Sequence, residues 1–162
     1  MGHTAEIGDA SVSGSYLHTV RFFPKPLNKS CYQLPVVADV PYLLRLWFTL
    51  GNYSQQWPTF TFSIETLSLL ASQNASFSYD SEAYYYEYMF VSSGKVVHIC
   101  FIRTLDTDDP FVNAIELRTL SAGMYSAAKP GTILGLSQRR NVGGSTLIRC
   151  FFLFFHISYK YF

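Results

Sequence analysis

Acidic side chains gather at two places in the sequence where paired carboxylates could do chemistry. Glu82 and Glu87 flank a run of tyrosines, and Asp106, Asp108 and Asp109 lie within one short segment. Glycosidases use two carboxylates on either side of the scissile bond, and clustered aspartates can bind calcium. Nothing in the sequence places a second carboxylate opposite the first, and a solvated loop explains the aspartates more simply. We therefore expect no metal site, and a glycosidase is the weaker alternative.

Motifs that would identify other enzyme classes are missing from the sequence. There is no P-loop, no dinucleotide-binding glycine motif, no serine-hydrolase elbow and no zinc-protease HExxH. The sequence predicts a protein that is not an enzyme and needs no cofactor.

Aromatic rings beside polar side chains form two candidate binding platforms. Tyr53 and Trp57 flank a segment rich in amides, and Tyr84, Tyr85 and Tyr86 form the second platform. Pyranose rings pack their apolar faces on aromatic rings while amides and carboxylates bind the hydroxyls. In a strand, the middle tyrosine of the three faces away from the other two, so at least one ring should be exposed. Saccharide binding is the hypothesis, and tyrosines packed on ordinary sheet faces are the alternative.

Three asparagines, Asn28, Asn52 and Asn74, stand in Asn-X-Ser motifs that N-glycosylation requires. The chain has five asparagines, and Ser plus Thr make 29 of its 162 residues. Chance would place about one asparagine in such a motif. The motifs favour a domain of the secretory pathway, with coincidence as the alternative.

Cysteine usage leaves two interpretations open. The chain has 3 cysteines, Cys31, Cys100 and Cys150, and no C-x-x-C pair. In an oxidising compartment Cys31 and Cys100 could form a disulfide across a sandwich, leaving Cys150 unpaired. The alternative is three buried, small, apolar side chains.

Composition and charge exclude several classes of protein. The chain has 162 residues, of which 49% are hydrophobic and 14% charged, so it is long and apolar enough for one folded domain. Its 12 Lys and Arg against 11 Asp and Glu argue against nucleic-acid binding, which needs clustered positive charge. No apolar run approaches the roughly 18 residues of a membrane span. No signal peptide is visible at the N-terminus.

The hydrophobic pattern is that of an all-β domain. The segment 59–65 alternates between apolar and polar residues, and prolines and glycines separate the apolar runs. Short strands with regular turn signals predict an antiparallel β-sandwich or jelly roll. The segment 66–73 is ambiguous, and a bulge or slip is expected within the last predicted strand. The predicted strands are 16–23, 30–34, 42–50, 59–65, 84–91, 96–103 and 111–120.

Six segments in order resemble the malectin-like extracellular domains of plant receptor-like kinases and related leucine-rich-repeat proteins. The resemblance covers about residues 16 to 140. No single segment is specific, but their order and spacing make coincidence a poor explanation. The segments are 18–24, 30–34, 42–48 running into 51–53, 58–64, 97–101 and 110–118, followed by Tyr125.

The resemblance implies a malectin-type β-sandwich at the cell surface, extracellular or associated with the plasma membrane. It implies a recognition module for cell-wall carbohydrate, a secreted peptide or a partner receptor ectodomain. The family usually carries two such lobes, so the chain resembles the first lobe, with a truncated, non-functional or decoy fragment as the alternative. Residues 1–15 are expected to be an irregular or truncated entrance, 16–140 the sandwich, and 141–162 an aromatic tail. That tail is either a non-native terminus or a final buried strand.

Overall fold

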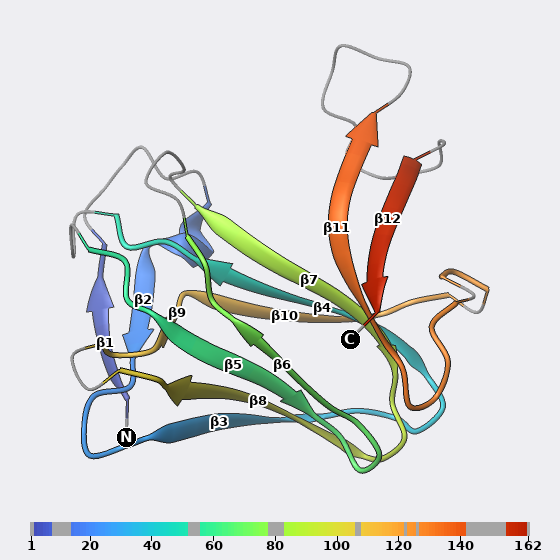
Figure 1. The fold of residues 1–162 in the computed structure, drawn as a ribbon, viewed down its shortest axis with the longest axis horizontal. Coiled ribbons are helices and arrows are strands. Elements are labelled where there is room, and N and C mark those ends of the chain that lie inside the picture. Colours follow the sequence, from blue (N-terminus) through green and yellow to red (C-terminus); the bar gives the residue numbers. More distant parts are fainter. Residues whose placement is uncertain are drawn as a thin grey trace.

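Two antiparallel β-sheets packed face to face make up most of the molecule in this computed structural model (Figure 1). The structure describes residues 2–7, 14–51, 56–77, 83–105, 108–121, 123–125, 127–141 and 155–161. The all-β, antiparallel sandwich predicted from the sequence is therefore confirmed.

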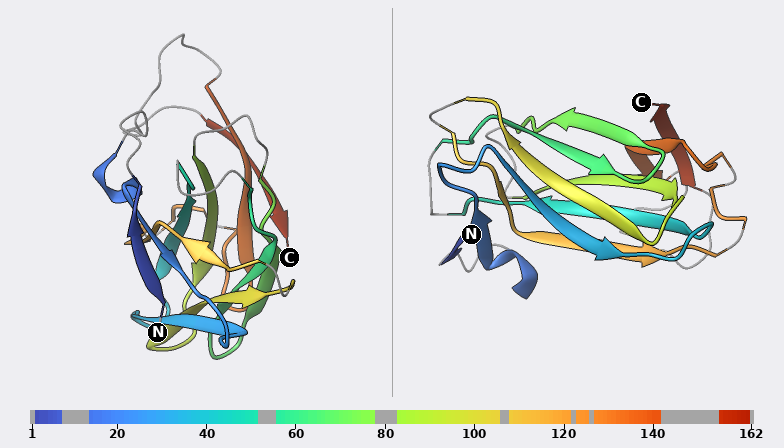
Figure 2. Two further views of the ribbon diagram at one scale, coloured as in Figure 1. Left: turned by 90° about the vertical axis from the view of Figure 1, so that its left-hand side faces the viewer. Right: turned by 90° about the horizontal axis from the view of Figure 1, so that it is seen from below.

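One sheet has five strands in the order β10-β4-β7-β11-β12, and the other has four in the order β3-β8-β5-β6. A third, three-stranded sheet, β1-β2-β9, lies at the end of the sandwich that holds the N-terminus (Figure 2). The five-stranded sheet consists of β4 (Pro41–Phe48), β7 (Tyr84–Val91), β10 (Ala114–Thr119), β11 (Ile133–Asn141) and β12 (Phe155–Tyr161). The four-stranded sheet consists of β3 (Lys29–Pro35), β5 (Phe60–Glu65), β6 (Leu70–Asn74) and β8 (Val96–Arg103), and the small sheet of β1 (His3–Glu6), β2 (Thr19–Phe22) and β9 (Phe111–Val112).

The core lies between the two large sheets and is built largely of phenylalanine. Alternation along β5 turns Phe60, Phe62 and Ile64 inward, each at most 1% exposed. Phe48 of β4 lies at the centre, with ring centroids 5.9 Å from Phe60 and 5.6 Å from Phe111. Burying rings of this size dominates the energetics of a core. The core therefore fixes which face of each strand points outward.

Three segments differ in detail from the expected strands. Residues Ser15–Leu17 form a short 3-10 helix, η1, so the strand expected from residue 16 begins only at Thr19. Within the stretch 1–15, expected to be irregular, β1 pairs with β2. The last predicted strand breaks at Asn113, where the chain crosses from β9 in the small sheet to β10 in the five-stranded sheet. This crossing between sheets accounts for the bulge or slip that the sequence predicts within 111–120.

At the C-terminal end, β12 pairs with β11 in antiparallel register. Within the described ranges, none of the helices is long and apolar enough to cross a membrane.

Cys31 and Cys100 face each other on the paired strands β3 and β8 and form a disulfide. The S–S distance is 2.07 Å and the Cα atoms are 4.0 Å apart. The bridge joins two neighbouring strands of the four-stranded sheet, and not the two sheets across the sandwich as expected, and it closes a loop of 69 residues.

Candidate binding surface

The three consecutive tyrosines of β7 divide between the two faces of the five-stranded sheet. Tyr86 contacts Phe62 of the opposite sheet at 5.0 Å between ring centroids, and Tyr84 packs near Phe77. Tyr85 points the other way and is 44% exposed. Of this predicted platform, only Tyr85 presents a largely exposed ring to solvent.

The ring of Trp57 belongs to the core rather than to an open platform. It stacks on Phe77 with centroids 4.6 Å apart and contacts Tyr84 edge-on at 5.5 Å. The other member of that predicted platform, Tyr53, lies outside the described residues. Because Trp57 and Tyr84 share an internal cluster, neither ring joins Tyr85 on the outer surface.

Tyr85 instead forms part of an aromatic face, defined here as Tyr16, Trp47 and Tyr85. Trp47 of β4 lies opposite Tyr85 in the sheet register, with ring centroids 5.1 Å apart. Tyr16 of η1 packs on the other side, 5.4 Å from Trp47, and is 46% exposed. Two exposed tyrosines thus flank one partly buried tryptophan on the outer face of the five-stranded sheet.

Arg45 lies against this face and is held by a buried carboxylate. Its guanidinium carbon lies 5.4 Å from the ring centroid of Trp47 and 5.1 Å from that of Tyr85. Its Nη2 and Nε donate to Glu87 Oε2 at 2.5 and 2.8 Å. The Glu87 side chain is 0% exposed and that of Arg45 19%. The ion pair therefore fixes a cation between two rings, where attraction to the ring faces adds to its orientation.

A second carboxylate orients the tryptophan. The indole Nε1 of Trp47 donates to Glu116 Oε1 of β10 at 2.6 Å. Glu116 also pairs with Arg118 on the same strand. A hydrogen bond to a charged acceptor is among the stronger ones in proteins. The position of the indole on the sheet is thus set from both neighbouring strands.

Asn113 positions Tyr16 through the backbone around η1. Its Nδ2 donates to Thr19 O at 3.0 Å and to Leu17 O at 3.4 Å. Its Oδ1 accepts a bond from the backbone N–H of Thr49 at 2.7 Å. One amide at the break between β9 and β10 therefore joins η1 and β2 to the end of β4, beside Trp47.

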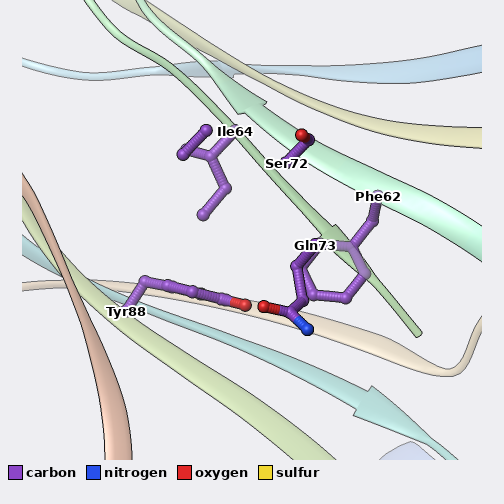
Figure 3. Close-up of a pocket in the computed structure, with 6 residues that line it drawn as sticks. Phe62, Ile64, Ser72, Gln73 and Tyr88 are labelled. Atoms are coloured by element: carbon purple, nitrogen blue, oxygen red, sulfur yellow. The ribbon is translucent and has the colours of Figure 1, made fainter. Parts of the chain in front are cut away.

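A recess of about 220 Å³ lies between the two large sheets, beside the edge strand β6. Figure 3 shows a smaller adjoining hollow, where the Tyr88 hydroxyl points toward the Gln73 side chain. Burial raises the pKa of Tyr88, and burial also raises the pKa of Tyr86, whose hydroxyl donates to Ser76 O at 2.8 Å. The recess is lined by Gln73, Tyr86, Glu87, Tyr88, Gly135, Leu136 and Ser137.

The remaining predicted carboxylates have structural partners. Asp109 pairs with Arg103 at 2.7 Å, and Asp108 Oδ2 accepts the backbone N–H of Thr59 at 2.6 Å. Glu82 and Asp106 lie outside the described residues. In the part of the chain that the structure describes, no three His, Cys, Asp or Glu side chains gather as a metal site.

The comparisons with known proteins agree with this architecture. The family model of the malectin-like domain matches residues 1–152. The chain belongs to the malectin-like family. The resemblance seen in the six sequence segments is thereby confirmed.

Relatives by sequence are plant proteins. The chain is 30% identical over 151 residues to the uncharacterised Arabidopsis thaliana protein At1g24485, covering 91% of this chain and 30% of the relative. It is 29% identical to the probable LRR receptor-like serine/threonine-protein kinase At1g51820 of the same plant, covering 81% of this chain and 14% of the kinase. The malectin-like chain thus spans less than a third of either relative.

Solved structures share the fold. The ANXUR2 extracellular domain from Arabidopsis thaliana superposes with a TM-score of 0.67 at 23% identity, covering 89% of this chain and 42% of that one. A structure of the plant peptide RALF23 in complex with FER and LLG2 gives 0.65 at 21% identity, covering 85% and 40%. These neighbours are malectin-like receptor ectodomains.

Trp47 of the aromatic face and the adjoining Arg45 were not singled out from the sequence. Both lie in the nearly continuous apolar run of the predicted strand 42–50. One signal was available in the sequence. Arg45 and Trp47 alternate with the aliphatic and aromatic residues Leu44, Leu46 and Phe48. That alternation indicates one buried and one accessible face.

Proposed function

We propose that this malectin-like chain is a non-catalytic, extracellular recognition module that binds a secreted peptide or a partner ectodomain through its aromatic face. The observation that carries the proposal is the cluster of Trp47, Tyr85 and Arg45 on one sheet surface. Trp, Tyr and Arg are the residues most enriched in the few contacts that dominate protein–protein binding.

The cluster is organised before any ligand arrives. Glu87 holds the Arg45 guanidinium, and Glu116 holds the indole of Trp47. Long side chains fixed in advance lose little conformational freedom on binding, which leaves more of the contact energy for affinity. This arrangement supports a docking surface.

The same contacts support a role without catalysis. The Glu87 carboxylate is buried under its ion pair with Arg45, so it does not reach an incoming substrate as an acid or base. A general acid or base must lie within hydrogen-bond reach of the proton it moves. Glu87 serves instead to orient Arg45.

The structural neighbours favour a peptide or protein ligand. FER was solved in complex with the peptide RALF23 and with LLG2. At 21% identity this likeness shows a shared fold and does not identify the ligand of this chain. The neighbour supplies a first probe to test.

The experiment measures binding of the secreted chain to RALF23, to a panel of synthetic secreted plant peptides and to a cell-wall glycan array. For any peptide that binds, Tyr85→Ala should weaken binding at least about tenfold, since the aromatic residues that dominate an interface contribute about 2 kcal/mol or more each. Leu67→Ala truncates a side chain that is 86% exposed in the turn before β6 and is the matched control. Equal affinities of the Tyr85→Ala, Tyr16→Ala and parent proteins would overturn the proposal.

A second candidate function is saccharide binding in the recess beside β6. It is favoured by the presence of Tyr86, Tyr88, Gln73 and Ser137 among the residues that line one cavity of about 220 Å³. Aromatic faces and amides are the groups that sugars contact. On the glycan array, Gln73→Ala should abolish such binding and Tyr85→Ala should leave it unchanged. The opposite result would assign the saccharide to the aromatic face.

A further inference from the structure

Two of the three Asn-X-Ser motifs lie on opposite edges of the four-stranded sheet. Asn28 directly precedes β3 and Asn74 ends β6, which are the two edge strands of that sheet. Asn28 O accepts the backbone N–H of Arg103 at 2.9 Å, and Arg103 in turn lies opposite Phe60. Asn74 lies opposite Thr61, one residue further along β5. Both asparagines therefore flank the same end of one sheet.

The amide of Asn74 is presented for modification. The residue is exposed, and its Oδ1 accepts a hydrogen bond from Thr61 Oγ1 at 2.7 Å. This bond holds the side chain on the outer face of the sheet. Its Nδ2, the atom that carries an N-linked glycan, donates no hydrogen bond to any described residue. A glycan at this nitrogen would extend into solvent without displacing a protein contact.

The hydroxyl of the Asn28 motif belongs to Ser30, at the start of β3. Ser30 Oγ is buried and makes no hydrogen bond to the residues that the structure describes. A buried hydroxyl without a partner destabilises the native state, and alanine would remove that cost. The glycosylation motif supplies the reason for serine here, because its hydroxyl is required for the modification itself.

The edge strand β6 has backbone groups that pair with no described strand and could form hydrogen bonds with a strand of another chain. The backbone N–H of Ala75 donates to Phe60 O at 2.8 Å, and bonded pairs alternate along an antiparallel ladder. The N–H and C=O groups of Leu70, Ser72 and Asn74 therefore point away from β5, and the described strands offer β6 no neighbour there. Leu70 is also 72% exposed. Open, partly apolar edges pair with other chains unless something covers them.

We propose that the chain is N-glycosylated at Asn28 and Asn74 and that these glycans cover the two edges of the four-stranded sheet. The inference rests on the proposed extracellular function. It leaves the aromatic face, on the other sheet, clear for a ligand. In the reaction, asparagine Nδ2 displaces the diphosphate from the anomeric carbon of a lipid-linked oligosaccharide. One N–C bond forms, one C–O bond breaks, and the amide loses one proton; the host's transferase catalyses the step.

The first test maps the glycans on the full chain secreted from plant cells behind a signal sequence. Peptide-N-glycosidase treatment in heavy-oxygen water should convert Asn28 and Asn74 to labelled aspartate, detected by mass spectrometry. Ser30→Ala and Ser76→Ala should each remove one glycan, and Ser76→Thr should retain it. Ser76→Ala keeps Asn74 and the backbone bonds between Ser76 and Tyr86. Unmodified Asn28 and Asn74 in the secreted, folded chain would overturn the proposal.

The second test measures association by size-exclusion chromatography with light scattering. The Ser30→Ala/Ser76→Ala variant, which lacks both glycans but keeps both asparagines uncharged, should form dimers or larger species at concentrations where the glycosylated chain is monomeric. Adding Ser72→Lys to this variant should restore the monomer, because a lysine on an edge strand blocks strand pairing. A Ser30→Ala/Ser76→Ala variant that stays monomeric would overturn the covering role. Neither test involves ligand binding, so failure here is distinguishable from failure of the proposed recognition function.

Discussion

Trp47 on β4 and Tyr85 on β7 lie directly opposite each other on the outer face of the five-stranded sheet, with ring centroids 5.1 Å apart. The pairing depends on the sheet register, since a slip of either strand by one residue would turn that strand's ring to the opposite face. Arg45 and Glu87, two residues further along the same two strands, form the next pair on this face. The register thus places two rings and a charge pair on one accessible surface.

Truncating one ring of each predicted platform should lower stability by different amounts. Trp57→Ala removes a half-buried ring that contacts Phe77, Tyr84 and Phe111, and should lower the free energy of unfolding by about 3 kcal/mol. Tyr85→Ala loses one cross-strand pair and should cost at most about 1 kcal/mol. Urea denaturation of both variants measures the difference. Equal losses would contradict the assignment of Trp57 to the core.

Much of the strand pattern could be predicted because it depends on local sequence. The expected bounds of β7 and β8 agree with the structure to the residue. Both are runs rich in aromatic or β-branched residues, bounded by turn residues, and such runs favour extended structure wherever they occur.

The aromatic face could not be predicted because it depends on contacts between distant segments. Tyr16 reaches Trp47 only because η1 interrupts the expected strand, and the backbone of η1 is held by Asn113, some 96 residues from Leu17 in sequence. The strands beside β4, which are β10 and β7, are likewise set by the topology of the whole sheet, and the residue pattern along β4 does not determine them. Alternation alone, by contrast, predicted that at least one of the three tyrosine rings of β7 is exposed, and that ring is Tyr85.

Asn113→Ala should loosen the aromatic face as well as the fold. The substitution removes the acceptor of the Thr49 N–H and the donor to Thr19 O. Loss of buried hydrogen bonds costs about 1–3 kcal/mol for each group left without a partner. Asn113→Asp keeps the acceptor for the Thr49 N–H but sets a carboxylate oxygen against the two backbone carbonyl oxygens that the amide Nδ2 binds, so it should also lower stability. Thermal unfolding measures the loss of stability, and tryptophan fluorescence in a Trp57→Phe background, where Trp47 is the one remaining tryptophan, measures the change at the aromatic face. Unchanged fluorescence in Asn113→Ala would contradict the positioning role.

Removing the disulfide should destabilise the sandwich strongly. The bridge between Cys31 and Cys100 closes 69 residues, and the loss of loop-closure constraint predicts a cost of about 4 kcal/mol. The double variant Cys31→Ala/Cys100→Ala should therefore unfold at a much lower urea concentration than the oxidised parent. A reducing agent should shift the parent toward the variant and leave the variant itself unchanged. A parent insensitive to reduction would contradict the prediction.

Ser30→Ala should stabilise the chain when it carries no glycan. The variant replaces a buried hydroxyl without a partner by a methyl group, which should raise the free energy of unfolding by about 1 kcal/mol. Bacterially produced, refolded protein is the material for this measurement. Thr61→Ala is the contrasting variant, since its hydroxyl donates to Asn74 and its removal should lower stability. A loss of stability in Ser30→Ala would show that the hydroxyl has a structural partner.

Stability should fall in alkaline solution because of the tyrosines beside the recess. Burial raises the pKa of Tyr88, and the neighbouring Tyr86 raises it further. An unfolded tyrosine titrates near pH 10, so above about pH 10 the native state binds more protons than the unfolded state. The contribution of Tyr88 is therefore fully present below about pH 10 and is lost as pH rises toward its folded pKa. Urea denaturation across this range should give a shallower decline for Tyr88→Phe than for the parent, while Leu67→Ala keeps the parent's slope. Phenolate absorbance that develops in the folded parent near pH 10 from every tyrosine would contradict a buried Tyr88 hydroxyl.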